Sequence, residues 1–398
     1  MDTFDSILKD LNFSVKPDLF AWEKYNRIID DSRTIKGDKQ LVQSEPFEFN
    51  LDTCGNELPN NRFFTNIGSA HFEGFFNKGS DNTLIVFFNG ARTGGNRYAL
   101  VSIPRFTSWS WHVKCQSSIL SFEDPMYYLY DECTLGWFYG TKEENFREYA
   151  AKIIKKVADN LQIPYSNIIL YGRSGGGTAA VGVSDFIKGC STVSVNMQID
   201  FEHYYYTEFF EKITGVNNLQ NDPRLNIADI IKRNSQNDYL VITNAASNID
   251  LSNDLKLLSE KCGFTPCYGL TVNENILSWV YEAYGAPEAH KAFENYYIFS
   301  LIITALRAYK AGVDLNTVNS FVDIVNEYWF EKYIGQSKAY KLNEELEKAK
   351  KENERQKEEI LEIKRQNDIL KKQLNKRQSN IIYRLLRKIK RVVKKIIK

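Results

Sequence analysis

The sequence predicts an α/β fold, with a mainly parallel sheet and helices on both of its faces. Short apolar runs, such as residues 83–88, alternate with segments of helical spacing, such as residues 143–161. This alternation is typical of parallel sheets that are covered by helices. Hydrophobic residues make up 43% and aromatic residues 14% of the chain, which is enough for a sizeable core. A glycine-rich turn at residues 172–177 follows one of the apolar runs.

The strand candidates are apolar runs, and helical patterns lie between most of them. They cover residues 71–76, 83–88, 118–122, 167–171, 191–199, 239–243 and 267–272. Residues 201–236 are rich in aromatic and polar side chains and interrupt the alternation, so we interpret them as a candidate lid. We take residues 1–335 as one globular domain, which two helical segments follow.

The turn at residues 172–177 joins a strand candidate to the start of a packed helix. Gly172, Ser174 and Gly176 have the Gly-x-Ser-x-Gly spacing of a nucleophile elbow, in which a strained turn lifts a serine hydroxyl above the sheet. The small residues on either side of the serine let strand and helix approach closely. We therefore take Ser174 as a candidate nucleophile; the alternative is a glycine-rich turn, such as one that binds phosphate.

A serine hydroxyl needs a base, and the chain has only four histidines. His290 is our candidate base, because it follows the last strand candidate and precedes a helix. A histidine can also be an ordinary hydrogen-bonded structural residue. We expect packing, binding or pocket-lining roles for the other three, which are His71, His112 and His203.

The base needs an acid that orients it. The acid should follow the strand candidate 239–243, and Asp250 lies shortly after that strand. Asp254 and Glu274 are alternatives, and Asp250 could instead cap a helix.

The oxyanion of a tetrahedral intermediate needs preorganised N–H donors. Gly175 directly follows the serine and is expected to supply one of them. The loop after strand candidate 83–88 reads Asn-Gly-Ala, and we expect the second donor there, with Ala91 ahead of Gly90.

These residues resemble the α/β-hydrolase superfamily over about residues 70–310. The order Ser174, Asp250, His290 matches its order of nucleophile, acid and base, and the Asn-Gly-Ala loop stands where many lipases and esterases carry His-Gly-Gly. The resemblance implies acyl transfer through a serine ester, without a resident cofactor. Water as acceptor would make an esterase. A sugar hydroxyl would make an acyltransferase, for which acetyl-CoA is a candidate acyl donor.

The cysteines and the chain start bear on metal binding and location. Cys262 and Cys267 are the closest pair of six scattered cysteines, and they lack Cys-x-x-Cys spacing and a nearby histidine. We therefore expect no metal site and reduced thiols. No apolar stretch has the length of a membrane span, and the first residues lack a signal-peptide pattern. These features favour a cytoplasmic protein.

The segment 338–377 has the three-and-four spacing of a coiled coil with a thin apolar seam. Asparagines at the same heptad position favour a parallel, in-register homodimer; a solvated single helix with many Glu/Lys pairs is the alternative. The seam consists of Leu342, Leu346, Ala349, Asn353, Gln356, Ile360, Ile363, Asn367, Leu370 and Leu374.

The segment 380–398 combines an apolar helical face with a basic remainder. It has eight basic residues and no acidic residue, so its formal charge is +8. The rest of the chain therefore has a formal charge of −7, because the total is +1. This pattern predicts an amphipathic helix on an anionic membrane surface; nucleic acid is a weaker alternative, because it would leave the apolar stripe uncovered. The basic residues are Arg384, Arg387, Lys388, Lys390, Arg391, Lys394, Lys395 and Lys398.

These features together predict a serine acyl-transfer enzyme, peripheral on the inner face of the cell membrane. Its layout of body, stalk and basic helix resembles bacterial glycan O-acetyltransferases and acetylesterases. We therefore expect acetyl transfer to, or ester hydrolysis on, a cell-surface polysaccharide or glycan. The alternatives are a non-catalytic scaffold with a hydrolase fold and a lipid esterase or thioesterase.

Overall fold

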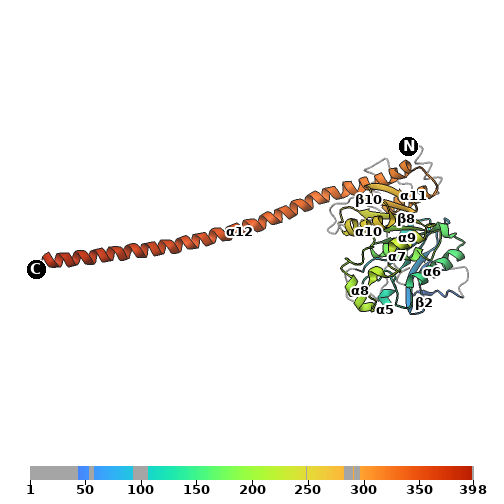
Figure 1. Ribbon diagram of the computed structural model, residues 1–398, viewed down its shortest axis with the longest axis horizontal. Helices are drawn as coiled ribbons and strands as arrows, with labels where there is room; N and C mark the ends of the chain where they lie inside the picture. Colours follow the sequence, from blue (N-terminus) through green and yellow to red (C-terminus); the bar gives the residue numbers. More distant parts are fainter. Residues whose placement is uncertain are drawn as a thin grey trace. The chain divides into compact units, whose positions relative to one another are not determined.

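The computed structural model describes residues 44–52, 58–92, 106–247, 249–281, 290 and 296–396. The chain divides into two compact units, Met1–Ile334 and Gly335–Lys398. The first contains the β-sheet and its helices, and helix α12 continues into the second (Figure 1).

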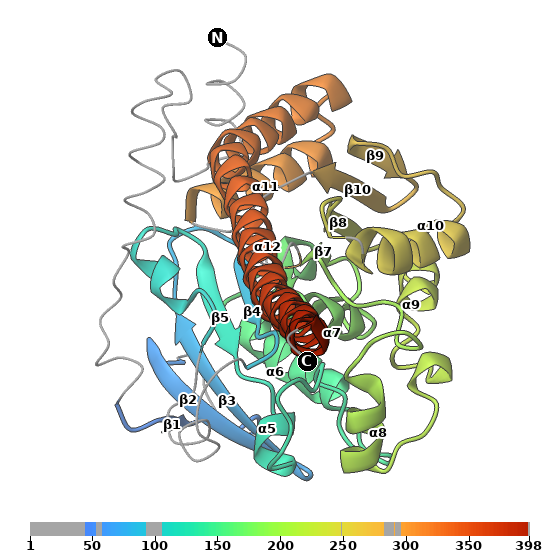
Figure 2. The same cartoon turned by 90° about the vertical axis from the view of Figure 1, so that its left-hand side faces the viewer.

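A ten-stranded sheet forms the frame of the first unit, within the described residues. Its central strands run parallel in the order β5-β4-β6-β7-β8-β10. Figure 2 labels β5, β4, β7, β8 and β10 of this series. Antiparallel pairs lie toward both edges, formed by β2, β3 and β5 on one side and by β10 and β9 on the other. The strands are β1 (Phe47–Glu48), β2 (Asn61–Ile67), β3 (Ala70–Asn77), β4 (Leu84–Phe88), β5 (Ser118–Phe122), β6 (Ile168–Arg173), β7 (Ser191–Val195), β8 (Asp238–Asn244), β9 (Gly269–Asn273) and β10 (Ile276–Tyr281).

Helices cover both faces of the sheet, because successive strand residues point to opposite sides. Val86 and Phe88 of β4 belong to a core cluster with α6, α7 and α8. Ile85 and Phe87 belong to a cluster with α11 and the first turns of α12. The helices are α5 (Met126–Leu129), α6 (Phe146–Asn160), α7 (Gly175–Ser184), α8 (Thr207–Thr214), α9 (Ile227–Arg233), α10 (Lys256–Cys262), α11 (Tyr296–Lys310) and α12 (Leu315–Ile396). The shorter turns are the 3₁₀-helices η1 (Trp109–Val113), η2 (Tyr165–Asn167) and η3 (Leu219–Asn221), and the π-helix η4 (Asp250–Leu255).

The predicted α/β fold with a mainly parallel sheet is confirmed. The strand expected at residues 191–199 is shorter, because β7 ends at Val195 and Asn196 has a positive φ of 48°. Strands β2 and β10 were not among the predicted elements. The candidate lid contains α8 and α9, whose buried Phe210 and Ile231 pack against the body.

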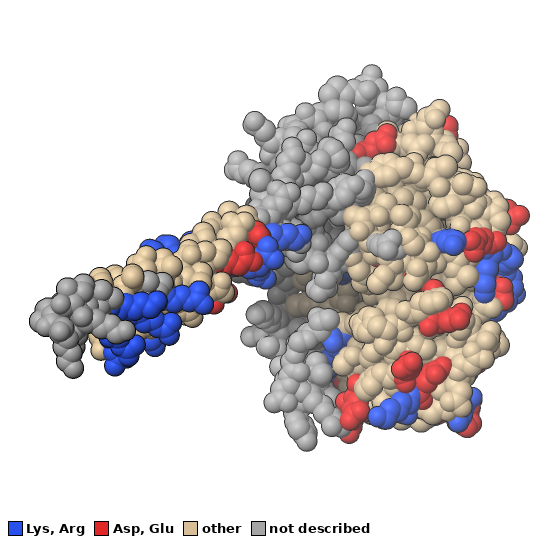
Figure 3. Space-filling model, turned by 60° about the vertical axis from the view of Figure 1, so that its left-hand side comes forward, with Lys and Arg blue, Asp and Glu red and all other residues tan. Residues whose placement is uncertain are grey.

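In the second unit, α12 runs without a break through the two segments that were expected as separate helices. Lys and Arg side chains cover much of its last described turns (Figure 3). Among the described residues, no helix combines the length and apolar character needed to cross a membrane. Apolar side chains that are 51–60% exposed occur along both segments, at Leu346, Ile360, Ile363, Leu370, Leu374, Ile382, Leu385, Leu386 and Ile389.

Candidate active site

The turn between β6 and α7 holds Ser174 in a strained conformation. Ser174 has φ 51° and ψ −130°, a region that non-glycine residues rarely occupy. Its N–H donates to the carbonyl oxygen of Val195 at 2.8 Å, which ties the turn to β7. A Cβ at residue 172 would lie 2.0 Å from the carbonyl oxygen of Gly176, and one at residue 176 would lie 2.3 Å from that of Phe88. Only glycine fits at these two positions, as the elbow pattern requires.

Three side chains that the sequence singled out form one hydrogen-bonded row. His290 Nε2 lies 2.8 Å from Ser174 Oγ, and His290 Nδ1 lies 2.7 Å from Asp250 Oδ1. Asp250 is 2% exposed, so its carboxylate faces the imidazole in a site with little water. Asn196 donates to the carbonyl oxygen of His290 at 2.9 Å and accepts the N–H of Asn244 at 2.9 Å. These two bonds hold the His290 backbone against the ends of β7 and β8.

The carboxylate of Asp250 determines the direction of the hydrogen bonds in this row. A carboxylate accepts only, so we assign the imidazole proton to Nδ1 of His290. The lone pair of Nε2 then accepts the hydroxyl proton of Ser174. This is the arrangement in which a histidine can act as a base toward a serine.

Asp254, the first alternative acid, has other partners. Its Oδ1 accepts the N–H groups of Ile199 and Asp200 at 2.5 and 2.8 Å. Burial raises its pKa to about 7, against the opposing effect of these two bonds. Glu274, the second alternative, lies in the turn before β10, where that strand pairs with the first residues of β8. Glu274 therefore lies at the amino-terminal ends of the parallel strands, whereas Ser174 follows the carboxyl end of β6.

The other histidines have local partners within the described residues. His71 contacts Asn66 at 2.8 Å, and His112 contacts the carbonyl oxygen of Trp109 at 2.7 Å. His203 lies 2.7 Å from Asp200, whose hydrogen bond and charge raise the pKa of the imidazole. None of these contacts joins Ser174.

The first residues of the loop after β4 lie close to the elbow, and a tyrosine from another segment holds them. A Cβ at residue 90 would lie 3.7 Å from the Cβ of Ser174. The hydroxyl of Tyr127 donates to the carbonyl oxygen of Gly90 at 2.9 Å. In a trans peptide the following N–H points the opposite way from that carbonyl, so this bond directs the N–H of Ala91 away from Tyr127. Ala91 itself is exposed.

Gly175 is the first residue of α7, and the first N–H groups of a helix have no partner inside it. Gly175 and Ala91 remain our candidates for the backbone donors to an anionic oxygen near Ser174. Further along the loop, Arg92 forms a buried ion pair with Glu123, and its N–H donates to the carbonyl oxygen of Thr134 at 2.8 Å. These contacts fix residues 90–92 in place.

Gln198 is a residue of this site that the sequence analysis did not single out. Its Nε2 donates to Ser174 Oγ at 2.8 Å and lies 3.3 Å from His290 Nε2. The indole N–H of Trp137 donates to Gln198 Oε1 at 3.3 Å. Gln198 lies just beyond β7, within the run that had been predicted as strand. A side-chain amide in such a run has no distinctive pattern, so only the folded structure reveals this contact.

The structure combines three features. They are a parallel sheet with antiparallel strands toward its edges, a strained serine turn after a central strand, and a histidine beyond the last strand. This arrangement resembles the α/β-hydrolase fold. No protein-family model and no curated protein matches the sequence.

Three solved structures are similar to parts of the chain. The capsule O-acetyltransferase of Neisseria meningitidis serogroup A has 17% identity and a TM-score of 0.45, over 64% of this chain and 98% of that one. The glycosylation-associated protein complex of Streptococcus agalactiae has 15% identity and a TM-score of 0.44, over 64% and 46%. A hormone-sensitive lipase from a metagenome library has 10% identity and a TM-score of 0.41, over 81% and 97%.

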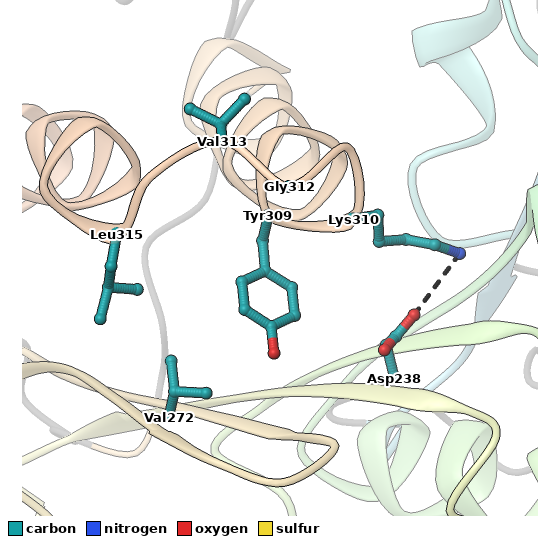
Figure 4. A pocket seen from close by; sticks show the side chains of 7 residues that line it. All are labelled: Asp238, Val272, Tyr309, Lys310, Gly312, Val313 and Leu315. Carbon is teal, nitrogen blue, oxygen red and sulfur yellow. Dashed lines mark ion pairs between the residues drawn. The ribbon is translucent and has the colours of Figure 1, made fainter.

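A pocket of about 520 Å³ lies away from this site (Figure 4). Lys310 at its rim lies 3.6 Å from Asp238, the first residue of β8. Ser174 lies beyond the opposite ends of the parallel strands, so this pocket does not contain the serine. Its lining residues are Asp238, Val272, Tyr309, Lys310, Gly312, Val313 and Leu315.

Two further expectations concern metals and the basic tail. No group of three or more potential ligands for a metal ion occurs among the described residues. Lys394 and Lys395 lie in α12, and Lys398 lies outside the described residues. Basic residues with exposed side chains in α12 include Arg384, Arg387, Lys388, Lys390 and Arg391.

Proposed function

We propose that the chain is a serine-dependent acyltransferase or esterase. The observation that carries the proposal is the row of Ser174, His290 and Asp250, with contacts of 2.8 and 2.7 Å, on a strained elbow. A structural serine on a relaxed loop would need neither the strained φ nor an oriented imidazole. Strain maintained at a polar, hydrogen-bonded site is typical of a functional residue.

In the proposed reaction, Ser174 Oγ attacks the acyl carbonyl while His290 Nε2 takes the hydroxyl proton. The Asp250 carboxylate stabilises the resulting imidazolium. The N–H groups of Gly175 and Ala91 donate to the oxyanion, with Gly90 shaping the loop. Collapse of the intermediate releases the leaving group with the proton from His290 and leaves an acyl ester on Ser174.

In the second half, an acceptor hydroxyl loses its proton to His290 Nε2 as its oxygen bonds to the acyl carbon. The bond between the acyl carbon and Ser174 Oγ then breaks, and His290 returns the proton to that oxygen. Water as acceptor yields a carboxylic acid, and a sugar hydroxyl yields an O-acyl sugar. With a thioester such as acetyl-CoA as donor, the leaving group is a thiol.

For the acyl group we propose acetyl. Leu135 and Trp137 are buried and lie against Gly175, where a Cβ would meet Leu135 Cδ1 at 2.2 Å and Trp137 Cδ1 at 3.3 Å. A wall this close to the expected oxyanion donor suits a short acyl chain. For the acceptor we propose a bacterial cell-surface glycan, because of the layout of body, stalk and basic helix noted above.

Labelling with a fluorophosphonate probe tests the nucleophile, with the labelled residue identified by mass spectrometry. We expect labelling at Ser174 in the wild type and none in Ser174→Ala or His290→Ala. His203→Ala is the matched control and should be labelled like the wild type, because His203 contacts Asp200 instead of the serine. A well-folded wild type that takes no label would favour the scaffold alternative.

For the second unit we propose a parallel dimer through 338–377 and binding to anionic membrane through 380–398. The exposed apolar side chains of both segments, such as Leu370 and Leu386, support this proposal, because a partner helix or a lipid interface would cover them. Paired basic helices would also gain from multivalency. We therefore propose that the enzyme acts on the inner face of the cell membrane.

Two truncations separate these roles. Deletion of 380–398 should abolish co-sedimentation with vesicles that contain phosphatidylserine, while turnover of a small soluble ester is retained. Deletion of 338–398 should in addition convert a dimer to a monomer by light scattering. Unchanged sedimentation in the first case, or an unchanged ratio of particle mass to chain mass in the second, would contradict the corresponding role.

A further inference from the structure

The amide of Gln198 lies beside both the proposed nucleophile and its base. Its Nε2 lies 2.8 Å from Ser174 Oγ and 3.3 Å from His290 Nε2. Gln198 is 1% exposed, so its amide forms its hydrogen bonds with protein groups instead of bulk solvent. A side chain so placed contacts both atoms that exchange the proton.

The neighbours of Gln198 determine which end of its amide faces the serine. The indole of Trp137 is a donor only, so the atom of Gln198 that it contacts must be the acceptor Oε1. The NH₂ group therefore faces Ser174 and His290. The backbone is fixed as well, because Thr178 Oγ1 of α7 donates to the carbonyl oxygen of Gln198 at 2.8 Å.

The orientation has different consequences before and after acylation. In the free enzyme, Ser174 Oγ accepts from Gln198 and donates to His290. Once Ser174 carries an acyl group, its oxygen no longer donates, and the lone pair of neutral His290 Nε2 is open to another donor. The NH₂ group of Gln198 lies within reach of that lone pair.

We propose that Gln198 determines acceptor specificity by occupying the basic lone pair of His290 in the acyl-enzyme. This inference rests on the proposed function. Water must form a hydrogen bond to this lone pair before it can attack, so it competes directly with the amide. An acceptor held by other contacts can displace the amide with its binding energy, whereas water has no such contacts. Gln198 thereby favours transfer to a bound hydroxyl over hydrolysis.

The test measures the two half-reactions separately, with p-nitrophenyl acetate as the donor. The rate of the p-nitrophenol burst reports acylation, and decay of the acetyl adduct on Ser174 in mass spectra reports deacylation by water. In Gln198→Met the side chain keeps its length but has no N–H. We expect the ratio of the deacylation rate to the burst rate to rise about three- to tenfold, the effect of one lost hydrogen bond.

Gln198→Asn withdraws the amide by one methylene and should change this ratio in the same direction, which covers the case that the methionine variant does not fold. Gln220→Met is the matched control, because that glutamine accepts the N–H groups of Phe201 and Glu202 and contacts neither reacting group. Added glycerol as an acceptor should yield less glyceryl acetate per acetate in the Gln198 variants than in the wild type.

Other outcomes would overturn the inference. Acylation and deacylation that fall together at least tenfold would make Gln198 an oxyanion donor. Unchanged rates in both variants would show that the amide does not compete with water. Absence of any acetyl adduct on wild-type Ser174 would instead refute the proposed function itself, a result that the adduct measurement distinguishes from the other two.

Discussion

Replacing Asp250 by asparagine separates the two neighbouring carboxylates of the site. Asp250 contacts His290 Nδ1 at 2.7 Å, whereas Asp254 accepts two backbone N–H groups and does not contact the histidine in the structure. Both side chains are buried. Asparagine has nearly the same shape as aspartate, so each substitution removes a charge while disturbing the packing little.

The expected effect of Asp250→Asn follows from the charge that develops on His290. During acylation the imidazole becomes a cation, with its charge centre about 4 Å from that of the carboxylate. At an effective dielectric constant of about 20, two unit charges at this separation attract each other by about 4 kcal/mol. Loss of that attraction in the transition state lowers the rate by about a thousandfold.

The assay is the rate of the p-nitrophenyl acetate burst at pH 7.5, with folding checked by circular dichroism. Asp254→Asn is the matched control. Its amide oxygen can still accept the N–H groups of Ile199 and Asp200, so we expect a burst rate within about twofold of the wild type. If Asp254→Asn instead lost activity and Asp250→Asn retained it, our assignment of the acid would be wrong.

Three further predictions concern stability and acyl-chain length. Burial raises the pKa of Asp254 from 3.8 to about 7, so its contribution to stability is full below pH 3.8 and is lost as the pH rises through 7; the urea midpoint of Asp254→Asn relative to wild type should therefore increase between pH 4 and 8, and a constant difference would contradict this. Leu135→Ala should raise turnover of p-nitrophenyl butyrate relative to acetate by about tenfold or more, by removing the wall beside Gly175; an unchanged ratio would place the acyl group elsewhere. Gly172→Ala should lower the free energy of unfolding by about 1–3 kcal/mol or more in urea titrations, because its Cβ would lie 2.0 Å from a backbone oxygen; a stability equal to wild type would show that the elbow relaxes easily.

Much of the fold could be predicted because its signals are local. The buried run before the elbow and the glycines around Ser174 are consecutive in sequence, and their pattern alone predicts strand, turn and helix. The choice of His290 depended on a different circumstance, the small number of histidines. The structure brings this residue to Ser174 across 116 positions of sequence; its catalytic role remains a proposal.

Other parts of the site depend on contacts that have no local pattern. The bond from Tyr127 to Gly90 spans 37 positions, and the bond from Trp137 to Gln198 spans 61. The sequence does not indicate which group a tyrosine hydroxyl or a glutamine amide will bind. The end of β7 was also missed, because Asn196 adopts its positive φ within a run that alternates like a strand. These features result from tertiary packing, which the periodicity of one segment does not encode.

The bond between Trp137 and Gln198 has a practical consequence for spectroscopy. Indole emission responds to the hydrogen bonding and polarity around its nitrogen, and Trp137 is fully buried, two hydrogen bonds from Ser174. Acylation that shifts the Gln198 amide toward His290 would change the surroundings of this fluorophore. Trp137 would therefore serve as a built-in reporter of the acyl-enzyme, and single turnovers of colourless natural esters could be followed in real time without a chromogenic leaving group.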